Sequence, residues 1–172
     1  MEWINPTYEI RNRRKKGQFS GVKFVELTPD ELADSKVSKM KFYWNLPAGQ
    51  QNSALINGKD EDGIVIPPDR FMFVGGFDPT NYAAGSEVIE GSKNGGYIMS
   101  MPDELADTRM RNTNTGILCC EYYDRSELPD EAFDDFLKMI IYYGAAVIVE
   151  GNASYVATRM LEEGMGRCVI VS

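Results

Sequence analysis

The sequence contains no histidine and only three cysteines, and these absences exclude several kinds of active site. Without histidine, the chain cannot build a Ser-His-Asp triad, a Cys-His dyad or a zinc site that depends on histidine. Cys119, Cys120 and Cys168 form no Cys-x-x-Cys motif and lie in apolar runs, so we expect buried free thiols in a cytosolic protein. Any acid–base or metal chemistry must therefore use carboxylates.

Long apolar runs are also absent. No stretch reaches the roughly 18 apolar residues of a membrane-spanning helix, and no apolar segment follows the charges near the N-terminus. We therefore expect neither a membrane span nor a signal peptide, and a location in the cytoplasm. The apolar fraction of 43% over 172 residues is enough for one core of ordinary size.

Positive charge is scarce and unevenly distributed. Residues 1–50 carry nine Lys/Arg and six Asp/Glu, whereas residues 51–172 carry nine and twenty, so the net charge changes from +3 to −11. The basic residues cluster at Arg11, Arg13, Arg14, Lys15 and Lys16. This cluster is either a solvated segment or an arm that contacts phosphates. The acidic remainder argues against a nucleic-acid enzyme that works alone, because it would need metal ions and a partner surface to offset repulsion.

Residues 1–65 lack sustained periodicity and are predicted to be a linker or N-terminal extension. Within them, Thr28 and Pro29 are typical of a helix start. The aromatic residues 42–44 have no predicted place, and residues 48–64 are polar and glycine-rich, which predicts a loop.

Residues 66–172 show a clear alternation of strands and helices. Strands are expected at residues 70–77, 97–101, 116–123, 145–149 and 167–171. The first three form an antiparallel meander, with a hairpin turn predicted at Gly95-Gly96.

Two helices follow the meander. One begins near Pro129, ends at Gly144 and buries a single apolar face. That face consists of Phe133, Phe136, Leu137, Ile140 and Ile141. A second helix is expected at residues 153–163, ending at Gly164. The order β-β-β-α-β-α-β predicts an α/β fold, in which helices pack on a mixed sheet.

Two acids stand where apolar strands end. Asp78 closes the run 71–77, and Glu150 closes the run 145–149. If these strands are neighbours, the two carboxylates meet at one edge of the sheet and can hold Mg²⁺ or Mn²⁺, because hard cations prefer oxygen ligands. The alternatives are structural: Asp78 in an Asp-Pro turn, and Glu150 paired with a nearby arginine. Asn152 is expected to cap the second helix.

Three segments carry a resemblance to a known family. They are Gly75-Gly-Phe-Asp78-Pro79, Glu121-Tyr-Tyr-Asp-Arg125 and Tyr142-Tyr-Gly-Ala-Ala-Val-Ile-Val-Glu150-Gly-Asn152. In this order, over residues 66–172, they resemble the ribonuclease H-like nuclease domain of the large terminase subunit of tailed phages. The third segment, with its acid followed by asparagine, is the most specific.

The resemblance implies a phage-encoded endonuclease that cuts concatemeric double-stranded DNA during packaging in the host cytoplasm. Asp78 matches the family's aspartate that bridges two metal ions, and Glu150 matches its second acid. Mg²⁺ or Mn²⁺ would be the cofactor, and the portal and motor of the packaging complex would be partners. Residues 1–65 would correspond to the segment after the motor.

The chain departs from the family in two ways. The family has a third acid well downstream of the second, but only 22 residues follow Glu150 and none fits that role. The family's motor motif, Gly-x-x-x-x-Gly-Lys-Ser/Thr, is absent. We therefore expect a fragment or a split gene product that cleaves DNA weakly or not at all. The alternatives are an inactive ribonuclease H-like module that binds a partner, and an unrelated α/β protein.

Two other features have structural interpretations. Gly75-Gly76 lies inside a predicted strand, which argues against a phosphate-binding loop. The pairs Tyr122-Tyr123 and Tyr142-Tyr143 are expected to pack in the core and sheet rather than to stack on bases.

Overall fold

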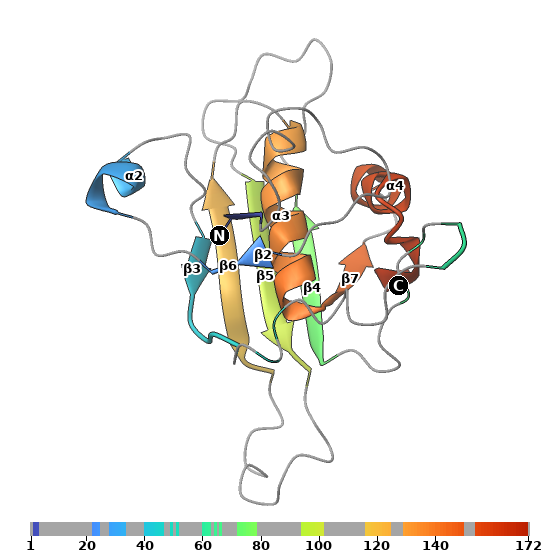
Figure 1. Cartoon of the computed structure of the whole chain (residues 1–172), viewed down its shortest axis with the longest axis horizontal. Coiled ribbons are helices and arrows are strands. Elements are labelled where there is room, and N and C mark those ends of the chain that lie inside the picture. The colour runs from blue at the N-terminus through green and yellow to red at the C-terminus, as the bar shows by residue number, and fades with distance from the viewer. Residues whose placement is uncertain are drawn as a thin grey trace, which may run out of the picture.

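A computed structural model describes a large part of the chain, including every helix and strand named below. The described residues are 2–3, 22–24, 28–33, 40–46, 49, 51, 60–62, 64, 66, 72–78, 94–101, 116–124, 129–149 and 154–171. Six strands form the main sheet, in the order β3-β6-β5-β4-β7-β8 (Figure 1). Their bounds are Met40–Phe42 for β3, Phe73–Asp78 for β4, Asn94–Ser100 for β5, Leu118–Asp124 for β6, Ala146–Val149 for β7 and Val169–Val171 for β8.

The sheet is mixed, as the sequence predicts. β4, β5 and β6 form the expected antiparallel meander, and β3 adds to β6 in antiparallel orientation. β7 runs parallel to β4, and β8 runs parallel to β7. From β4 onward the order of elements is β-β-β-α-β-α-β. The α/β fold class, with helices packed on a mixed sheet, is confirmed.

The prediction of a hairpin turn at Gly95-Gly96 was wrong. Both glycines lie inside β5, where they pair with Asp78 and Phe77 of β4. Adjacent glycines are common in tight turns, but they also occur inside strands where another group lies close to the backbone. The last predicted strand is shorter than expected, because Gly166–Cys168 form a 3₁₀ turn before β8 begins.

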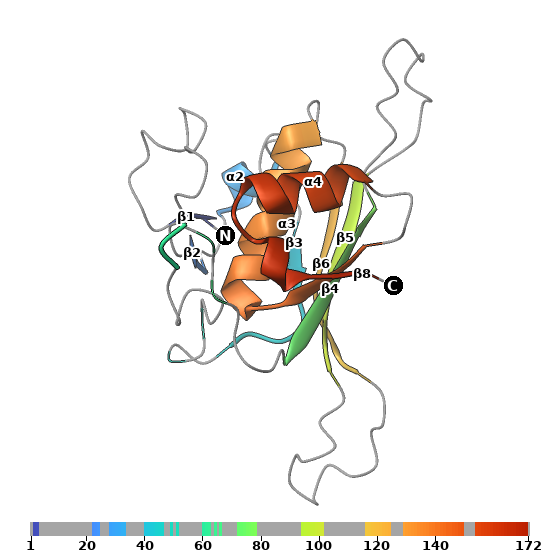
Figure 2. The same cartoon turned by 90° about the vertical axis from the view of Figure 1, so that its right-hand side faces the viewer.

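Helix α3, Pro129–Tyr143, is buried on more than one side. The predicted apolar face is confirmed, and Met139, Tyr142 and Tyr143 are fully buried as well. Figure 2 shows the reason: α3 lies between the main sheet and a small antiparallel pair, formed by β1, Glu2–Trp3, and β2, Val22–Lys23. Val22 of β2 belongs to the same buried cluster. A helix with partners on two sides buries more than one stripe.

Helix α4, Ser154–Glu162, packs beside α3 on the same face of the sheet (Figure 2). Tyr155 of α4 donates a hydrogen bond to Asp130 of α3 at 3.0 Å, and Arg159 lies 5.2 Å from the centre of the Phe133 ring. Glycines with positive φ follow both helices, at Gly144 (63°) and Gly164 (76°), as their predicted capping role requires.

Part of the N-terminal region belongs to the main sheet. β3 lies at its edge, and the Tyr143 hydroxyl donates a hydrogen bond to the Trp44 carbonyl at 2.6 Å. Tyr142 donates a second one to the side chain of Asn45. Of the aromatic residues without a predicted place, Phe42 packs against the core and Trp44 lies beside Phe73, whereas Tyr43 is exposed. The division at residue 65 stays a prediction.

The short helix α2, Pro29–Ala33, begins where predicted. The backbone N–H of Thr28 donates to the Glu31 carboxylate at 2.8 Å, and the Glu31 N–H donates back to the Thr28 hydroxyl at 3.4 Å. This reciprocal pair is a capping box. None of the helices in the described part of the chain has the length and apolar character needed to cross a bilayer.

Candidate functional site

Asp78 is the last residue of β4 and lies on the face of the sheet that the helices leave open. The neighbouring Phe77 stacks on Phe136 of α3 with ring centres 4.8 Å apart, so Phe77 points toward the helices. Because side chains alternate along a strand, Gly76 and Asp78 face the opposite side. Asp78 is exposed to solvent there.

The strand that precedes Glu150 lies beside β4. Val74 and Gly75 of β4 are in register with Ala146 and Val147 of β7, and the two strands are parallel. Parallel neighbours end at the same edge of a sheet. The structure therefore contains the adjacent strands that the prediction of a shared metal site at Asp78 and Glu150 requires. Glu150 itself lies outside the described residues, as do Pro79, Arg125 and Asn152. The pairing of the two carboxylates stays a prediction.

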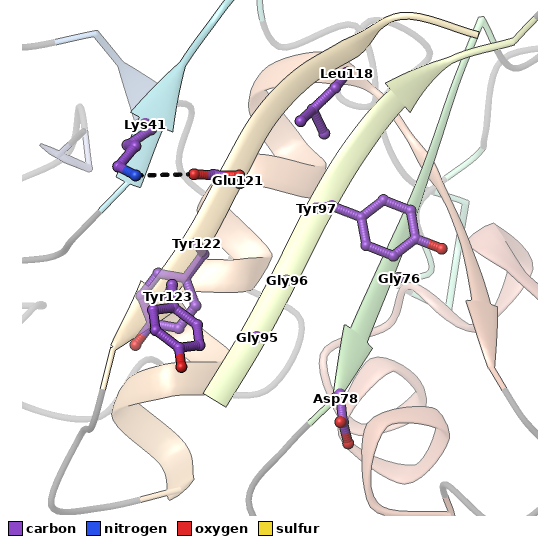
Figure 3. Close-up of a pocket in the computed structure, with 10 residues that line it drawn as sticks. All are labelled: Lys41, Gly76, Asp78, Gly95, Gly96, Tyr97, Leu118, Glu121, Tyr122 and Tyr123. Carbon is purple, nitrogen blue, oxygen red and sulfur yellow. Dashed lines mark ion pairs between the residues drawn. The ribbon is translucent and has the colours of Figure 1, made fainter. Parts of the chain in front are cut away.

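A pocket of about 460 Å³ opens on this face and includes Asp78 (Figure 3). The residues that line it come from β3, β4, β5 and β6. They are Lys41, Gly76, Asp78, Gly95, Gly96, Tyr97, Leu118, Glu121, Tyr122 and Tyr123. At Gly95 an added Cβ would meet nothing within 4 Å, so a ligand can come close to the backbone of the sheet there.

The position of Tyr97 depends on Gly76. The Tyr97 ring extends over β4 at Gly76, as Figure 3 shows, and a Cβ added at Gly76 would lie 2.7 Å from ring atoms. Any other residue at position 76 would therefore displace the ring. Two residues further along β4 is Asp78, so the ring and the carboxylate lie on one face near the same end of the strand.

Glu121 is the second acid of the pocket and is already held by neighbours. Its carboxylate lies 3.1 Å from the Lys41 ammonium, and a hydrogen bond from the Tyr43 hydroxyl, followed by that from Lys41, lowers its pKa. Glu121 is in register with Tyr97 and Gly76, two strands and two residues away from Asp78. With strands about 4.8 Å apart, this exceeds the reach of a shared metal ion.

The described residues supply one suitable metal ligand at this site. They contain no group of three His, Cys, Asp or Glu side chains close enough to hold an ion. The exposed carboxylate of Asp78 fits Mg²⁺ or Mn²⁺, which accept one or two carboxylates and complete their coordination with water. Any further protein ligand must come from outside the described ranges.

The three cysteines do not contribute to the site. Cys119, Cys120 and Cys168 are buried and free, as predicted. Burial raises the pKa of Cys120 to about 12 and that of Cys168 to about 11. The thiolate is the reactive form of cysteine, so these side chains are poor nucleophiles at neutral pH.

The tyrosine pairs are not all alike. Tyr122, Tyr142 and Tyr143 are core residues, as predicted, but Tyr123 is 58% exposed and lines the pocket. The sequence interpretation also overlooked Tyr97, which is 42% exposed. The alternation of Tyr97 with the buried Ile98 was the available signal, since one of two successive strand residues must face away from the core.

Comparison of the chain with protein-family models, with curated proteins and with solved structures found no match in any of the three.

Proposed function

We propose that this chain is a metal-dependent DNA endonuclease domain of the terminase type, with a ribonuclease H-like fold, in which Asp78 and Glu150 hold Mg²⁺ or Mn²⁺. One observation carries the proposal: β4 and β7 are parallel neighbours. The sequence singles out the acids at the ends of these two strands, and parallel neighbours end at the same edge of the sheet. Acids that only end their own strands need not follow adjacent strands, whereas two ligands of one ion must lie close together.

The fold and the pocket support the proposal. The order β-β-β-α-β-α-β and the mixed sheet agree with the fold that the sequence resemblance implies. Asp78 lies at the edge of a pocket of about 460 Å³, which has room for a nucleotide unit. Gly95, where an added Cβ would meet nothing within 4 Å, leaves the backbone opposite Asp78 open to a ligand.

The described residues would bind the ions, position the DNA strand and hold β4 in place. Divalent ions, when bound, activate the attacking water and stabilise the leaving oxygen of a phosphodiester. Asp78 would bind the ions through its exposed carboxylate. The tyrosines and glycines of the pocket would position the DNA strand, and α3 would keep β4 in place by packing Phe136 against Phe77.

A second function is a ribonuclease H-like module that does not cleave and instead binds the portal or the motor. Two observations favour it. The described residues contain no cluster of three metal-binding side chains, and residues 51–172 have a net charge of −11, which repels DNA.

The test compares the parent with Asp78→Asn in two assays. The first measures the melting temperature with Mg²⁺, with Mn²⁺ and with EDTA, because an ion that binds only the folded state raises it. The second measures nicking of supercoiled plasmid with Mn²⁺. Asp62→Asn is the matched control, since Asp62 is exposed in a turn and does not line the pocket.

We expect Mn²⁺ to raise the melting temperature of the parent and of Asp62→Asn, but not that of Asp78→Asn. Nicking that follows the same pattern supports the endonuclease. A metal-dependent rise without nicking supports the module that does not cleave. A parent that shows neither effect, or an Asp78→Asn variant that behaves as the parent does, contradicts the assignment of the site.

A further inference from the structure

Two exposed tyrosines flank the bare backbone of Gly95 on the open face of the sheet. Tyr97 on β5 is 42% exposed and Tyr123 on β6 is 58% exposed. Tyr123 is in register with Gly95, two residues from Tyr97 along β5. Figure 3 shows the Tyr97 ring over β4 and the Tyr123 ring over β6, with Gly95 and Gly96 between them.

Packing does not explain Gly95. A side chain at Gly75 would meet Ile140 and Ile98 at 2.8 Å, and one at Gly76 would meet the Tyr97 ring, so both glycines have a packing role. A Cβ at Gly95 would meet nothing within 4 Å. Glycine weakens a strand and is found there at bulges, at bends and where another molecule approaches closely. Gly95 pairs regularly with Asp78 and Tyr123, which favours close approach.

The charges of the pocket indicate which chemical groups of that molecule can contact it. Among the described residues that line it, Lys41 is the only cation, and it lies 3.1 Å from the Glu121 carboxylate. Asp78 adds a second negative charge. Such a surface has no surplus cation for a phosphate backbone but offers aromatic rings, and every nucleic-acid base has a face that can stack on a ring.

We propose that the groove between Tyr97 and Tyr123 binds an unpaired DNA strand, by stacking bases on the two rings above the Gly95 backbone. The identity of the ligand as DNA rests on the proposed function. Bases inside a duplex cannot stack on protein side chains, so the strand to be cut must reach this groove locally unpaired. Asp78 lies in the same pocket, which brings the phosphodiester near the proposed metal ligands.

The experiment measures binding without cleavage. A fluorescently labelled 12-nucleotide single strand and the corresponding duplex are titrated with the protein in EDTA, and anisotropy is recorded at several salt concentrations. We expect the single strand to bind more tightly than the duplex. We also expect a weak dependence on salt, because stacking releases few counterions.

Four variants locate the binding. Tyr97→Ala and Tyr123→Ala should each weaken single-strand binding by about 5-fold or more, the range of a lost base stack. Tyr97→Phe keeps the ring and should bind as the parent does. Gly95→Val should weaken binding by filling the floor of the groove. Leu161→Ala is the control, because Leu161 is 63% exposed on α4, which lies on the other face.

The outcomes separate this proposal from the proposed function. If the tyrosine variants bind the single strand as the parent does, or the duplex binds at least as tightly, the groove does not stack bases, even if Asp78 binds metal. If single-strand binding depends on the tyrosines but Asp78→Asn changes neither metal binding nor nicking, the groove stands and the nuclease assignment fails. A parent that binds no single strand overturns the groove.

Discussion

The two faces of the main sheet are built by alternate residues of the same strands, yet their surroundings differ completely. On the covered face, Phe77, Ile98 and Tyr122 pack against α3 and are partly or fully buried. On the open face, Asp78, Tyr97 and Tyr123 are exposed and line a pocket. The covered face supplies most of the apolar burial that stabilises the sheet, whereas the exposed side chains of the open face contribute little to it. Stability and binding should therefore respond to different substitutions.

The largest effect is expected from Phe136→Ala on the covered side. Phe136 is fully buried and stacks on Phe77, so its loss should lower the free energy of unfolding by about 3–5 kcal/mol. Urea denaturation followed by circular dichroism measures the change. Tyr97→Ala on the open face is the comparison, with an expected loss below about 1 kcal/mol. Equal losses would mean that the open face also carries the fold.

Alkaline pH should affect the covered face next most strongly. Burial raises the pKa of Cys120 from 9.0 to about 12, so folding favours the neutral thiol. This contribution is fully present below pH 9, and it is lost as pH rises through the folded-state value, because the unfolded chain then releases a proton that the folded chain keeps.

The measurement is the free energy of unfolding between pH 8 and pH 11. At pH 11 the contribution of Cys120 should be reduced by about 3 kcal/mol. Cys120→Ala removes this thiol, so it should flatten the pH dependence although it lowers stability at neutral pH. An unchanged slope would show that Cys120 is accessible to water.

A smaller and sharper contrast comes from the same substitution on each face. Gly75→Ala places a Cβ 2.8 Å from Ile140 and Ile98 and should cost about 1–3 kcal/mol. Gly95→Ala meets nothing within 4 Å and should be neutral or stabilise by about 0.5 kcal/mol, since alanine loses less backbone entropy. Melting temperatures measure both. A destabilised Gly95→Ala would remove the argument that this glycine serves a ligand.

The smallest effect is expected at the Lys41–Glu121 ion pair. Both side chains are partly or largely exposed, and such pairs are screened by water and salt. Lys41→Met should leave the denaturation midpoint unchanged within error. Its effect should instead appear at the pocket, as a rise in the pKa of Glu121 toward its ordinary value, measured by NMR titration. A large loss of stability would mean that β3 depends on this pair.

The sequence revealed each strand of the main sheet except β3, and it revealed the apolar face of α3. Apolar residues at helical spacing located α3, and the runs before Asp78 and Glu150 located β4 and β7. Of the candidate site, Asp78 was found because it ends a strand. Tyr97 was missed because Tyr97 and Ile98 are both typical strand residues, and their alternation alone does not say which of the two faces the core. Gly95 was misread, since two adjacent glycines are typical of both turns and close approaches.

Local chemistry thus determined that β4 to β8, α3 and α4 form, where α3 and α4 end, and which side of α3 is apolar. Tertiary structure alone decided that β7 lies beside β4, that residues 40–42 extend the sheet, and that α3 is buried from two sides. Backbone hydrogen bonds between strands are nearly the same for every residue, so a sequence pattern carries little information about the partner. The partner follows from how the apolar faces pack, and this depends on the whole chain at once.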